Sequence, residues 1–345
     1  SAQKAGGNFN KGMLDRRILE ICSTPLRRIL ERLPASIINN FQELRLRQER
    51  PLCLRCIQDE FFVTHDGRVT RNPREAYFIT KSDIEKIFLN LTRSSVYTLD
   101  EELRSGFITI SGGHRVGFTG EAVLQNGRVK SLKNVTSINI RISREVKGCA
   151  DLVLPLIIDT SLNTVYHTLI ISPPGCGKTT LLRDIVRQIS NGIPSMGFKG
   201  VNVGLVDERS EIAACYNGMP QNDVGLRTDV LDRCPKAEGM YMLVRSMAPH
   251  VIATDELGRA EDIAAVEEVL NAGIKLITTV HGVDLEDIKK RPVIDQLLKK
   301  TLFHRIIILS GTKTVGTVED VVDGLNGRSL LEKKSKKTHG RMSRP

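Results

Sequence analysis

The chain has 345 residues, of which 40% are hydrophobic and 4% are aromatic, and it contains no tryptophan. This length is enough for two domains with separate cores, and the composition is that of a globular protein whose cores rest on Ile, Leu and Val. No apolar stretch approaches the roughly 20 residues that a membrane-spanning helix requires. Composition therefore argues against both an integral membrane protein and a disordered one.

The net charge of +10 is unevenly distributed along the chain. Residues 328–345 carry seven basic side chains and one acidic side chain, so more than half of the excess lies there. A lysine-rich terminus is typical of a solvated, disordered tail, and contact with anionic lipid or nucleic acid is the alternative. The rest of the chain has no basic stripe with interleaved aromatic residues, so nucleic acid is not an expected partner.

The cysteine pattern indicates the redox state of the protein and the compartment in which it works. Seven scattered cysteines, an odd number, favour reduced thiols and a cytoplasmic protein. Cys53 and Cys56 form one close pair, for which strand packing is favoured over zinc because no second pair accompanies it. Residues 1–12 are polar and are expected to be a disordered lead or a tag remnant.

Residues 13–145 are expected to form an α+β domain. Apolar periodicity predicts helices that end before Pro34, followed by strands over 43–47 and 52–56. Interruptions between residues 143 and 165 predict the domain boundary. Local motifs predict three turns and one capped helix: Asp66-Gly67, Gly112-Gly113, Asn126-Gly127, and a capping box of Ser82 with Glu85.

Residues 146–327 alternate strand and helix, which predicts a mainly parallel sheet covered by helices. One helix follows Lys178 and stops at Asn191-Gly192, and another runs from about Glu261 to Asn271. The expected strands are 168–172, 201–206, 251–254, 274–280 and 305–309.

A phosphate-binding loop is predicted between the strand over 168–172 and the helix that begins at Lys178. Its glycines let backbone N–H groups close around phosphate oxygens, Lys178 reaches the β and γ phosphates, and the Thr179 hydroxyl ligates Mg²⁺. Ser172 replaces the usual first glycine of the motif, and Pro173-Pro174 stiffen the turn instead. The predicted nucleotide-binding residues are Pro174, Gly175, Cys176, Gly177, Lys178, Thr179 and Thr180.

Two carboxylates, Asp255 and Glu256, end the apolar strand over 251–254, which is the form of a Walker B segment. We assign the metal to Asp255 and the polarisation of attacking water to Glu256. The full strand between the phosphate-binding loop and this segment is typical of RecA-like NTPases with a catalytic glutamate. No Asn-Lys-x-Asp guanine motif is present, so ATP is favoured over GTP.

Further polar residues end two neighbouring strands. Asp207, assigned to the metal, and Glu208, assigned to catalysis, follow the strand over 201–206, and His281 ends the strand over 274–280. The carboxyl ends of parallel strands meet at one sheet edge, so these groups should converge on the nucleotide. In a RecA-like topology the His281 strand lies between the phosphate-loop and Walker B strands, where the imidazole can sense the γ-phosphate. Mg²⁺ and arginines must offset the repulsion among these carboxylates.

Four blocks resemble the stage III sporulation protein AA family of endospore-forming bacteria, itself similar to type II and type IV secretion and pilus-motor ATPases. The blocks are residues 43–47, 112–117, 206–213 and 220–236, and the resemblance extends over about residues 15–330. It implies a hexameric mother-cell ATPase at the inner face of the cytoplasmic membrane. Such a protein energises a secretion-like channel complex with membrane-embedded sporulation proteins.

The resemblance also implies residue roles. Asp207-Glu208 match the acidic box of the motors, Glu256 their Walker B glutamate and His281 their histidine box. The motors usually carry glycine where Asp255 stands, and their arginine follows the glutamate by two residues, whereas Arg259 follows Glu256 by three. Their metal-binding cysteine cluster is absent.

An arginine from a neighbouring subunit is expected to complete the site, because the local carboxylates cannot stabilise a negatively charged transition state. The candidates are Arg209, Arg227 and Arg259 in the P-loop domain and Arg104, Arg115 and Arg141 in the first domain. Arg115 is the first choice and Arg141 the second; pairing with nearby acids on a solvated strand face is the alternative.

Residues 215–238 are expected to form a long connection, in which Arg227, Asp229 and Arg233 either contact a neighbouring subunit or lie on a surface insertion. Two other functions remain open. They are an ATP-gated scaffold with little turnover and a RecA-like nucleic-acid translocase.

Overall fold

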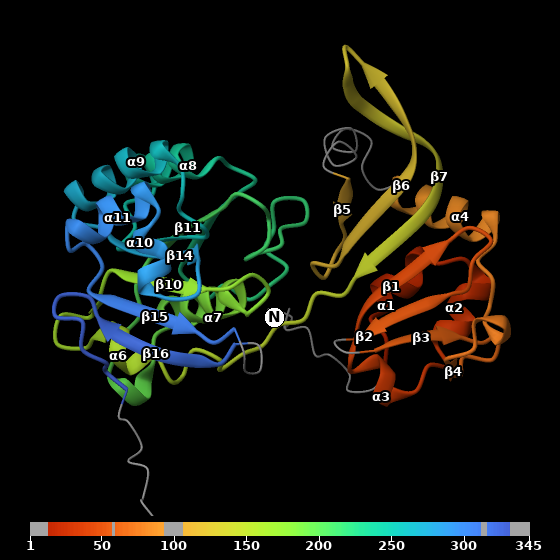
Figure 1. Ribbon diagram of the computed structural model, residues 1–345, viewed down its shortest axis with the longest axis horizontal. Helices are drawn as coiled ribbons and strands as arrows, with labels where there is room; N and C mark the ends of the chain where they lie inside the picture. The colour runs from red at the N-terminus through yellow and green to blue at the C-terminus, as the bar shows by residue number, and fades with distance from the viewer. Residues whose placement is uncertain (1–12, 57–58, 93–105, 312–315, 332–345) are drawn as a thin grey trace, which may run out of the picture. The chain divides into compact units, whose positions relative to one another are not determined.

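The computed structural model describes residues 13–56, 59–92, 106–311 and 316–331. Contacts divide the chain into two compact units (Figure 1). The N-terminal unit comprises the chain up to Arg144 together with residues 214–222, and the C-terminal unit comprises 145–213 and the chain from Asp223 onward. The expected lead over residues 1–12 lies outside the described residues.

The N-terminal unit is an antiparallel sheet of order β4-β3-β2-β1-β7-β6-β5, with helices on one face. Strand β1 alternates buried and more exposed residues, so that Phe41, Leu44 and Leu46 join the core beneath the helices. The elements are α1 (Arg16–Ile21), α2 (Thr24–Leu30), α3 (Ala35–Ile38), β1 (Phe41–Arg47), β2 (Cys53–Cys56), β3 (Glu60–Val63), β4 (Val69–Thr70), the 3₁₀ helix η1 (Pro73–Glu75), α4 (Lys81–Thr92), β5 (Phe107–Thr109), β6 (Arg115–Gln125) and β7 (Arg128–Arg141).

Two local expectations for this unit are corrected by the structure. The capping box of α4 consists of Thr80 and Asp83: the Asp83 N–H donates to Thr80 Oγ1 at 3.1 Å, and the Thr80 N–H donates to Asp83 Oδ2 at 2.9 Å. Ser82 and Glu85, the expected pair, lie two residues too late because the helix already begins at Lys81. A further short helix, α3, follows Pro34 instead of the chain leaving helix there.

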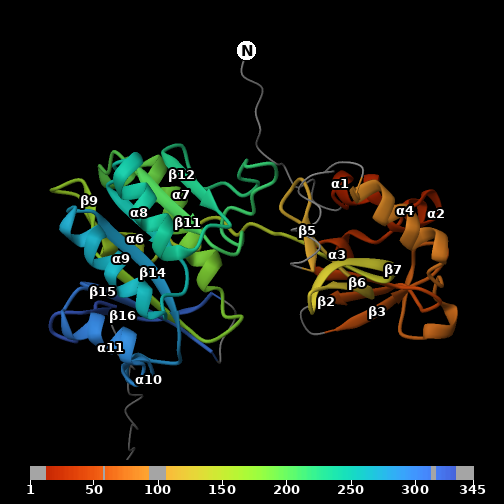
Figure 2. The ribbon, with the colours of Figure 1, turned by 90° about the horizontal axis from the view of Figure 1, so that it is seen from above.

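The C-terminal unit is a seven-stranded sheet of order β12-β11-β13-β14-β10-β15-β16 (Figures 1 and 2). All neighbouring strands are parallel except β15 and β16. The strands are β10 (Thr168–Ser172), β11 (Val203–Asp207), β12 (Thr228–Asp232), β13 (Val251–Thr254), β14 (Lys275–His281), β15 (Arg305–Leu309) and β16 (Val318–Asp323), and β8 (Ile158–Asp159) pairs with β9 (Thr164–Val165) in a separate ribbon.

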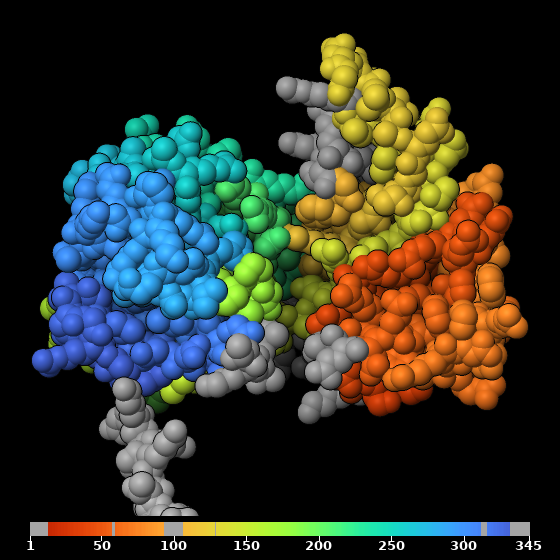
Figure 3. Space-filling view, viewed as in Figure 1, coloured from red at the N-terminus to blue at the C-terminus, as the bar shows by residue number. Residues whose placement is uncertain are grey.

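Helices cover both faces of this sheet. Side chains of α8, α9, α10 and α11 pack in one apolar cluster with Leu169, Ile171 and other strand residues. Helix α7 lies against the opposite face, and the space-filling view shows the later elements, in blue, forming the near surface of the unit (Figures 1 and 3). The helices are α6 (Leu154–Ile157), α7 (Lys178–Asn191), η2 (Pro194–Met196), α8 (Lys236–Ser246), α9 (Ala260–Asn271), α10 (Leu285–Lys289) and α11 (Pro292–Lys299).

Residues 215–238 are more ordered than the sequence predicts. They contain β12 and the start of α8, and residues 214–222 are part of the N-terminal unit, where the Gly112 N–H donates to Gln221 Oε1 at 2.9 Å. Strand β12 is a half-exposed sheet edge with mixed polarity, so periodicity gave no signal for it. Arg227 Nη1 donates to Ser190 O at 2.7 Å, at the end of α7 in its own chain.

The expected basic tail starts later than residue 328. The Leu330 N–H donates to Val321 O at 2.7 Å and Ser329 Oγ donates to Asp320 Oδ1 at 2.6 Å, so residues 328–331 extend the fold beside β16. Residues 332–345 lie outside the described part of the chain.

Candidate nucleotide site

The phosphate-loop sequence leads from the end of β10 into α7. Strand β10 is buried along its whole length, and Gly175 and Gly177 have φ angles of 75° and 93°, which a side chain would strain. Helix α7 begins at Lys178 directly after Gly177, and the backbone N–H groups of its first turn face the loop. Pro174 and Gly175 are exposed, and Thr179 and Thr180 are half-buried on the first turn of α7.

Strand β14 lies between β10 and β13, so the predicted position of the His281 strand is confirmed. His281 is the register partner of Ser172, and the Gly282 N–H donates to Ser172 O at 3.1 Å. Sheet pairing therefore fixes His281 beside the start of the phosphate loop, although more than a hundred residues separate them in the sequence.

The Glu256 carboxylate contacts two cationic side chains and one imidazole. Its Oε2 lies 3.8 Å from Lys178 Nζ, 3.2 Å from Arg209 Nη1 and 3.5 Å from His281 Nε2. These residues come from α7, the loop after β11 and the end of β14. The sequence predicted that Lys178, Glu256 and His281 would share a site and named Arg209 among the candidate arginines, but it did not predict that Arg209 would reach this oxygen.

Asp255 is buried beside Glu256 and carries an unsatisfied oxygen. Its Oδ2 accepts no hydrogen bond from the described residues, and burial raises the pKa of this carboxyl, an effect that the nearby Lys178 and Lys236 oppose. A cation at Oδ2 would relieve the cost of this burial. The described residues contain no group of three or more His, Cys, Asp or Glu side chains that could hold a metal alone. A metal here needs further ligands from a nucleotide or water.

Asp207 is engaged by the loop that follows it. Its carboxylate accepts backbone hydrogen bonds from Glu211, Ile212 and Ala213 at 2.8, 3.0 and 2.8 Å. Burial nevertheless raises the pKa of Asp207 to about 6. Arg183 of α7 holds the same loop by donating to Ile212 O and Glu211 O. Asp207 thus anchors the loop after β11, and its metal ligation stays a prediction.

Lys236, a residue that sequence reasoning missed, joins the two candidate catalytic glutamates. Its side chain is only 6% exposed, and its Nζ donates to Glu256 O at 2.7 Å and lies 3.3 Å from Glu208 Oε2. It stands at the first position of α8, where the helix dipole disfavours a positive charge. A lysine in this unfavourable position, directly after Cys-Pro and before an amphipathic helix, is the sequence feature that could have indicated its role.

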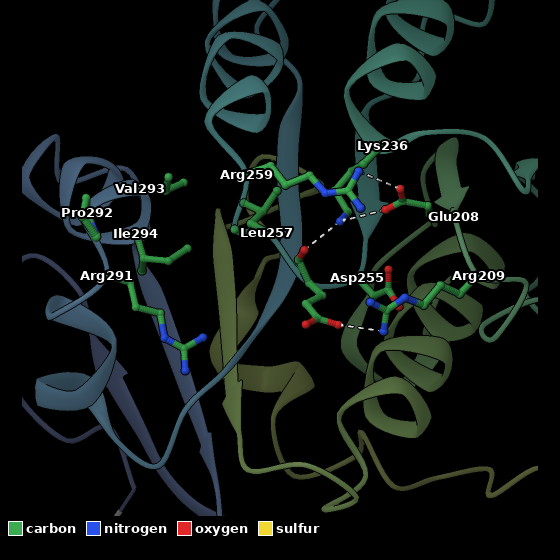
Figure 4. A pocket seen from close by; sticks show the side chains of 12 residues that line it. Glu208, Arg209, Lys236, Asp255, Leu257, Arg259, Arg291, Pro292, Val293 and Ile294 are labelled. Carbon is green, nitrogen blue, oxygen red and sulfur yellow. Dashed lines mark hydrogen bonds and ion pairs between the residues drawn. The ribbon is translucent and has the colours of Figure 1, made fainter. Parts of the chain in front are cut away.

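A cavity of about 300 Å³ opens beside these residues. Figure 4 shows Lys236 and Arg259 converging on Glu208, and Arg259 Nη1 lies 3.3 Å from Glu208 Oε1. The lining residues are Glu208, Arg209, Lys236, Asp255, Glu256, Leu257, Gly258, Arg259, Arg291, Pro292, Val293 and Ile294.

The two arginines expected to act between subunits belong to the N-terminal unit. The Arg115 guanidinium lies 4.8 Å from the centre of the Phe107 ring, and Arg141 Nε lies 3.4 Å from Glu43 Oε1. Arg141 therefore pairs with a nearby acid, as the alternative to a role between subunits predicted. The role of Arg115 or Arg141 at a nucleotide stays a prediction.

The order of the parallel strands, the phosphate loop between β10 and α7, and the acidic residues at the ends of β11 and β13 define a RecA-like P-loop NTPase domain. In fold the chain is similar to the ATPase DotB of Legionella pneumophila, with a TM-score of 0.54, 16% sequence identity, and coverage of 83% of this chain and 76% of that one. The predicted fold class is confirmed.

The chain belongs to the family described as sporulation stage III, protein AA, whose profile matches residues 14–329. It is 41% identical over 306 residues to stage III sporulation protein AA of Bacillus subtilis (strain 168), covering 89% of this chain and 94% of that protein. It is 25% identical over 232 residues to protein SEEDLING PLASTID DEVELOPMENT 1 of Arabidopsis thaliana, covering 67% of this chain and 31% of that protein. The family resemblance seen in the sequence is confirmed.

Proposed function

We propose that this chain is a Mg²⁺-dependent ATPase that energises a secretion-like channel complex between mother cell and forespore. Its family membership supports the sporulation setting, and its RecA-like fold supports a nucleotide-driven activity. The observation that carries the proposal is the 3.8 Å approach of Lys178 Nζ, from the phosphate loop, to Glu256 Oε2, at the end of β13. A phosphate-binding group and a candidate base thus share one site.

In this proposal Lys178 binds the β and γ phosphates of ATP, and Glu256 accepts a proton from the attacking water. The water oxygen forms a bond to the γ-phosphorus, the bond from that phosphorus to the β–γ bridging oxygen breaks, and ADP leaves. Glu256 suits this task because its backbone is fixed: its N–H donates to Thr279 Oγ1 at 2.9 Å and its carbonyl accepts from Lys236.

Thr179 and Asp255 would hold Mg²⁺ when it is bound with ATP. The unsatisfied, buried Asp255 Oδ2 fits a hydrated cation, and a hydroxyl on the first helical turn is the usual P-loop ligand. When bound, Mg²⁺ neutralises charge that develops on the phosphate oxygens. Asp255 itself contributes a fixed negative charge that orients the cation.

A homo-oligomer, a hexamer by family resemblance, would let an arginine of one subunit reach the nucleotide of another. Arg115 is our candidate, because it stands at the start of β6 inside the glycine-rich block that the family resemblance includes. Association with membrane-embedded sporulation channel proteins at the cytoplasmic face follows from the same resemblance. Within the described residues, no helix combines the length and apolar character needed to cross a membrane.

Turnover by the purified full-length protein tests the activity. We expect ATP hydrolysis that requires Mg²⁺ and disappears in Lys178→Ala, because that substitution removes the charge facing the phosphates. Tight ATP binding without turnover would support the scaffold function instead. Turnover that depends on added single-stranded nucleic acid would support a translocase.

Flotation with anionic vesicles tests the membrane contact. Residues 332–345 hold six basic side chains and one acidic one, and a protein ending at Leu331 keeps the bonds of Ser329 and Leu330 to β16. We expect full-length protein to float at low salt and the shortened protein to float less. Equal flotation of both would remove the tail from this role.

A further inference from the structure

Two cations, Lys178 and Arg209, and the His281 imidazole contact a single carboxylate oxygen. Lys178, Arg209 and His281 all approach Glu256 Oε2, within 3.2 to 3.8 Å. Lys178 belongs to the predicted phosphate loop, and the lysine at this position of a P-loop binds the terminal phosphates of a nucleotide. The cations that pair with this carboxylate oxygen, Lys178 and Arg209, are of the kind that bind phosphate oxygens.

In this arrangement Glu256 Oε2 already has ion-pair partners in Lys178 and Arg209. A γ-phosphate carries more negative charge than a carboxylate and competes for the same cations. Binding of ATP would draw the cations away and leave the Glu256 carboxylate available for water.

We propose that Glu256 and the γ-phosphate of ATP compete for the same cations, and that Arg209 moves from Glu256 to the γ-phosphate when ATP binds. Arg209 is then a γ-phosphate ligand supplied by the same subunit, in addition to any arginine from a neighbour. The inference rests on the proposed function, because it requires ATP to bind at the phosphate loop. ADP lacks the γ-phosphate and leaves Arg209 on Glu256.

The backbone around both residues confines this exchange to side chains. Glu256 has a φ of 41°, a strained value for a residue other than glycine, and hydrogen bonds fix its N–H and carbonyl groups. The loop carrying Arg209 is held by the Asp207 carboxylate and by Arg183. The Arg209 side chain is 60% exposed, which leaves it room to change partner.

Arg259 provides a matched comparison in the same cavity. Its side chain is 68% exposed and its Nη1 makes an ion pair of nearly the same length, 3.3 Å against 3.2 Å for Arg209. Its partner, however, is Glu208 Oε1, and no contact with Glu256 accompanies it among the described ion pairs. The two arginines differ in the carboxylate they face, which is the feature the inference depends on.

The test measures equilibrium affinities for ADP and for the non-hydrolysable imido analogue of ATP, both with Mg²⁺, by calorimetry on full-length protein. Arg209→Ala should weaken the affinity for the analogue by about tenfold or more, because a charge-assisted contact contributes about that much. The affinity for ADP should change less than twofold. Arg259→Ala should leave the ratio of the two affinities within twofold of wild type. Circular dichroism melting confirms that each variant is folded.

Three outcomes overturn the inference and leave the proposed function standing. Arg209→Ala leaves the affinity for the analogue unchanged, or it weakens the affinities for ADP and for the analogue equally. In the third, Arg259→Ala lowers the ratio of analogue affinity to ADP affinity as much as Arg209→Ala does. If wild-type protein binds neither nucleotide, the proposed function fails first and the inference falls with it. The readout is binding, so absence of turnover does not affect the result.

Discussion

The Glu256 N–H donates a hydrogen bond to the side-chain Oγ1 of Thr279, at 2.9 Å. Glu256 follows β13, whereas Thr279 lies within the neighbouring strand β14, so this bond ties the candidate base to the strand that carries His281. The Leu257 N–H donates to the Thr279 carbonyl at 3.0 Å and strengthens the connection. The bond supports a backbone whose φ of 41° is otherwise unfavourable.

Replacing Thr279 by valine should therefore destabilise the protein. The substitution keeps the shape of the side chain and leaves the Glu256 N–H without its acceptor, which costs about 1–3 kcal/mol of unfolding free energy. The adjacent Thr278 is a matched control, because it is equally buried and its Oγ1 has no partner among the described residues. Thr278→Val should be neutral or stabilising.

Urea unfolding of the two valine variants measures the difference, and single-turnover ATP hydrolysis measures the effect on the base. We expect Thr279→Val to slow turnover more than it weakens ATP binding. Equal stability of the two variants would show that the Glu256 N–H finds another acceptor.

The two candidate glutamates should respond differently to loss of charge. Glu256→Gln keeps the shape and loses the basicity, so ATP should still bind while hydrolysis falls by a factor on the order of 10² or more. Glu208 faces Lys236 and Arg259 rather than the phosphate-loop lysine, so Glu208→Gln should have the smaller effect. Near-normal turnover in Glu256→Gln, with loss of turnover in Glu208→Gln, would exchange their roles.

We expect Lys236 to hold Glu256 and Glu208 in position rather than to bind ATP. Lys236→Met removes the donor to Glu256 O and one of the two cationic partners of Glu208, and we expect about 1–3 kcal/mol of destabilisation because the part-buried Glu256 carbonyl loses its donor. The rate of hydrolysis should fall while ATP affinity stays close to wild type. Lys289→Met, which removes only a surface pair with Glu286, should change stability by less than about 0.5 kcal/mol.

His167 should make the protein less stable in mild acid. Its Nδ1 accepts from the Leu276 N–H at 3.1 Å, and burial, aided by Lys275 and His304, lowers its pKa to about 4 from 6.5. Between these two pH values the unfolded chain binds a proton that the folded chain excludes, so stability falls as the pH drops from 6.5 toward 4.

His167→Gln removes this titration. Denaturant midpoints of wild type and variant, measured at steps from pH 7 to pH 4.5, should converge as the pH falls, because only the wild type loses this contribution. Parallel curves would contradict the assignment. Other titrating groups, such as Asp207, are present in both proteins and do not affect the difference.

A mixing experiment tests Arg115 across a subunit interface. Lys178→Ala protein lacks a working phosphate loop and still supplies Arg115, while Arg115→Ala protein has the opposite defect. Their mixture should regain partial ATPase activity after subunit exchange, because some interfaces combine the two intact parts. Full activity of Arg115→Ala alone would remove this arginine from the mechanism, and absence of recovery after verified exchange would count against action between subunits.

The sequence determined the local parts of this protein. The phosphate loop, α7 and the boundaries of β10, β13 and β15 followed from contiguous patterns, because helix periodicity, glycine positions and buried strands are properties of neighbouring residues. One part of the strand order also followed, the place of β14 between β10 and β13, because few topologies are compatible with those motifs. Edge strand β12 escaped prediction because a half-exposed strand carries little apolar signal.

The tertiary structure alone decided which charged groups face one another. Asp207 and Glu208 are adjacent in the sequence, yet one turns inward to three backbone N–H groups and the other outward to Lys236 and Arg259. Arg209 reaches Glu256 from another strand end. The ion-pair partners of Glu208 and Arg209 are separated from them by tens of residues, and their pairing depends on sheet register, burial and loop anchoring, which arise only when the strands are assembled.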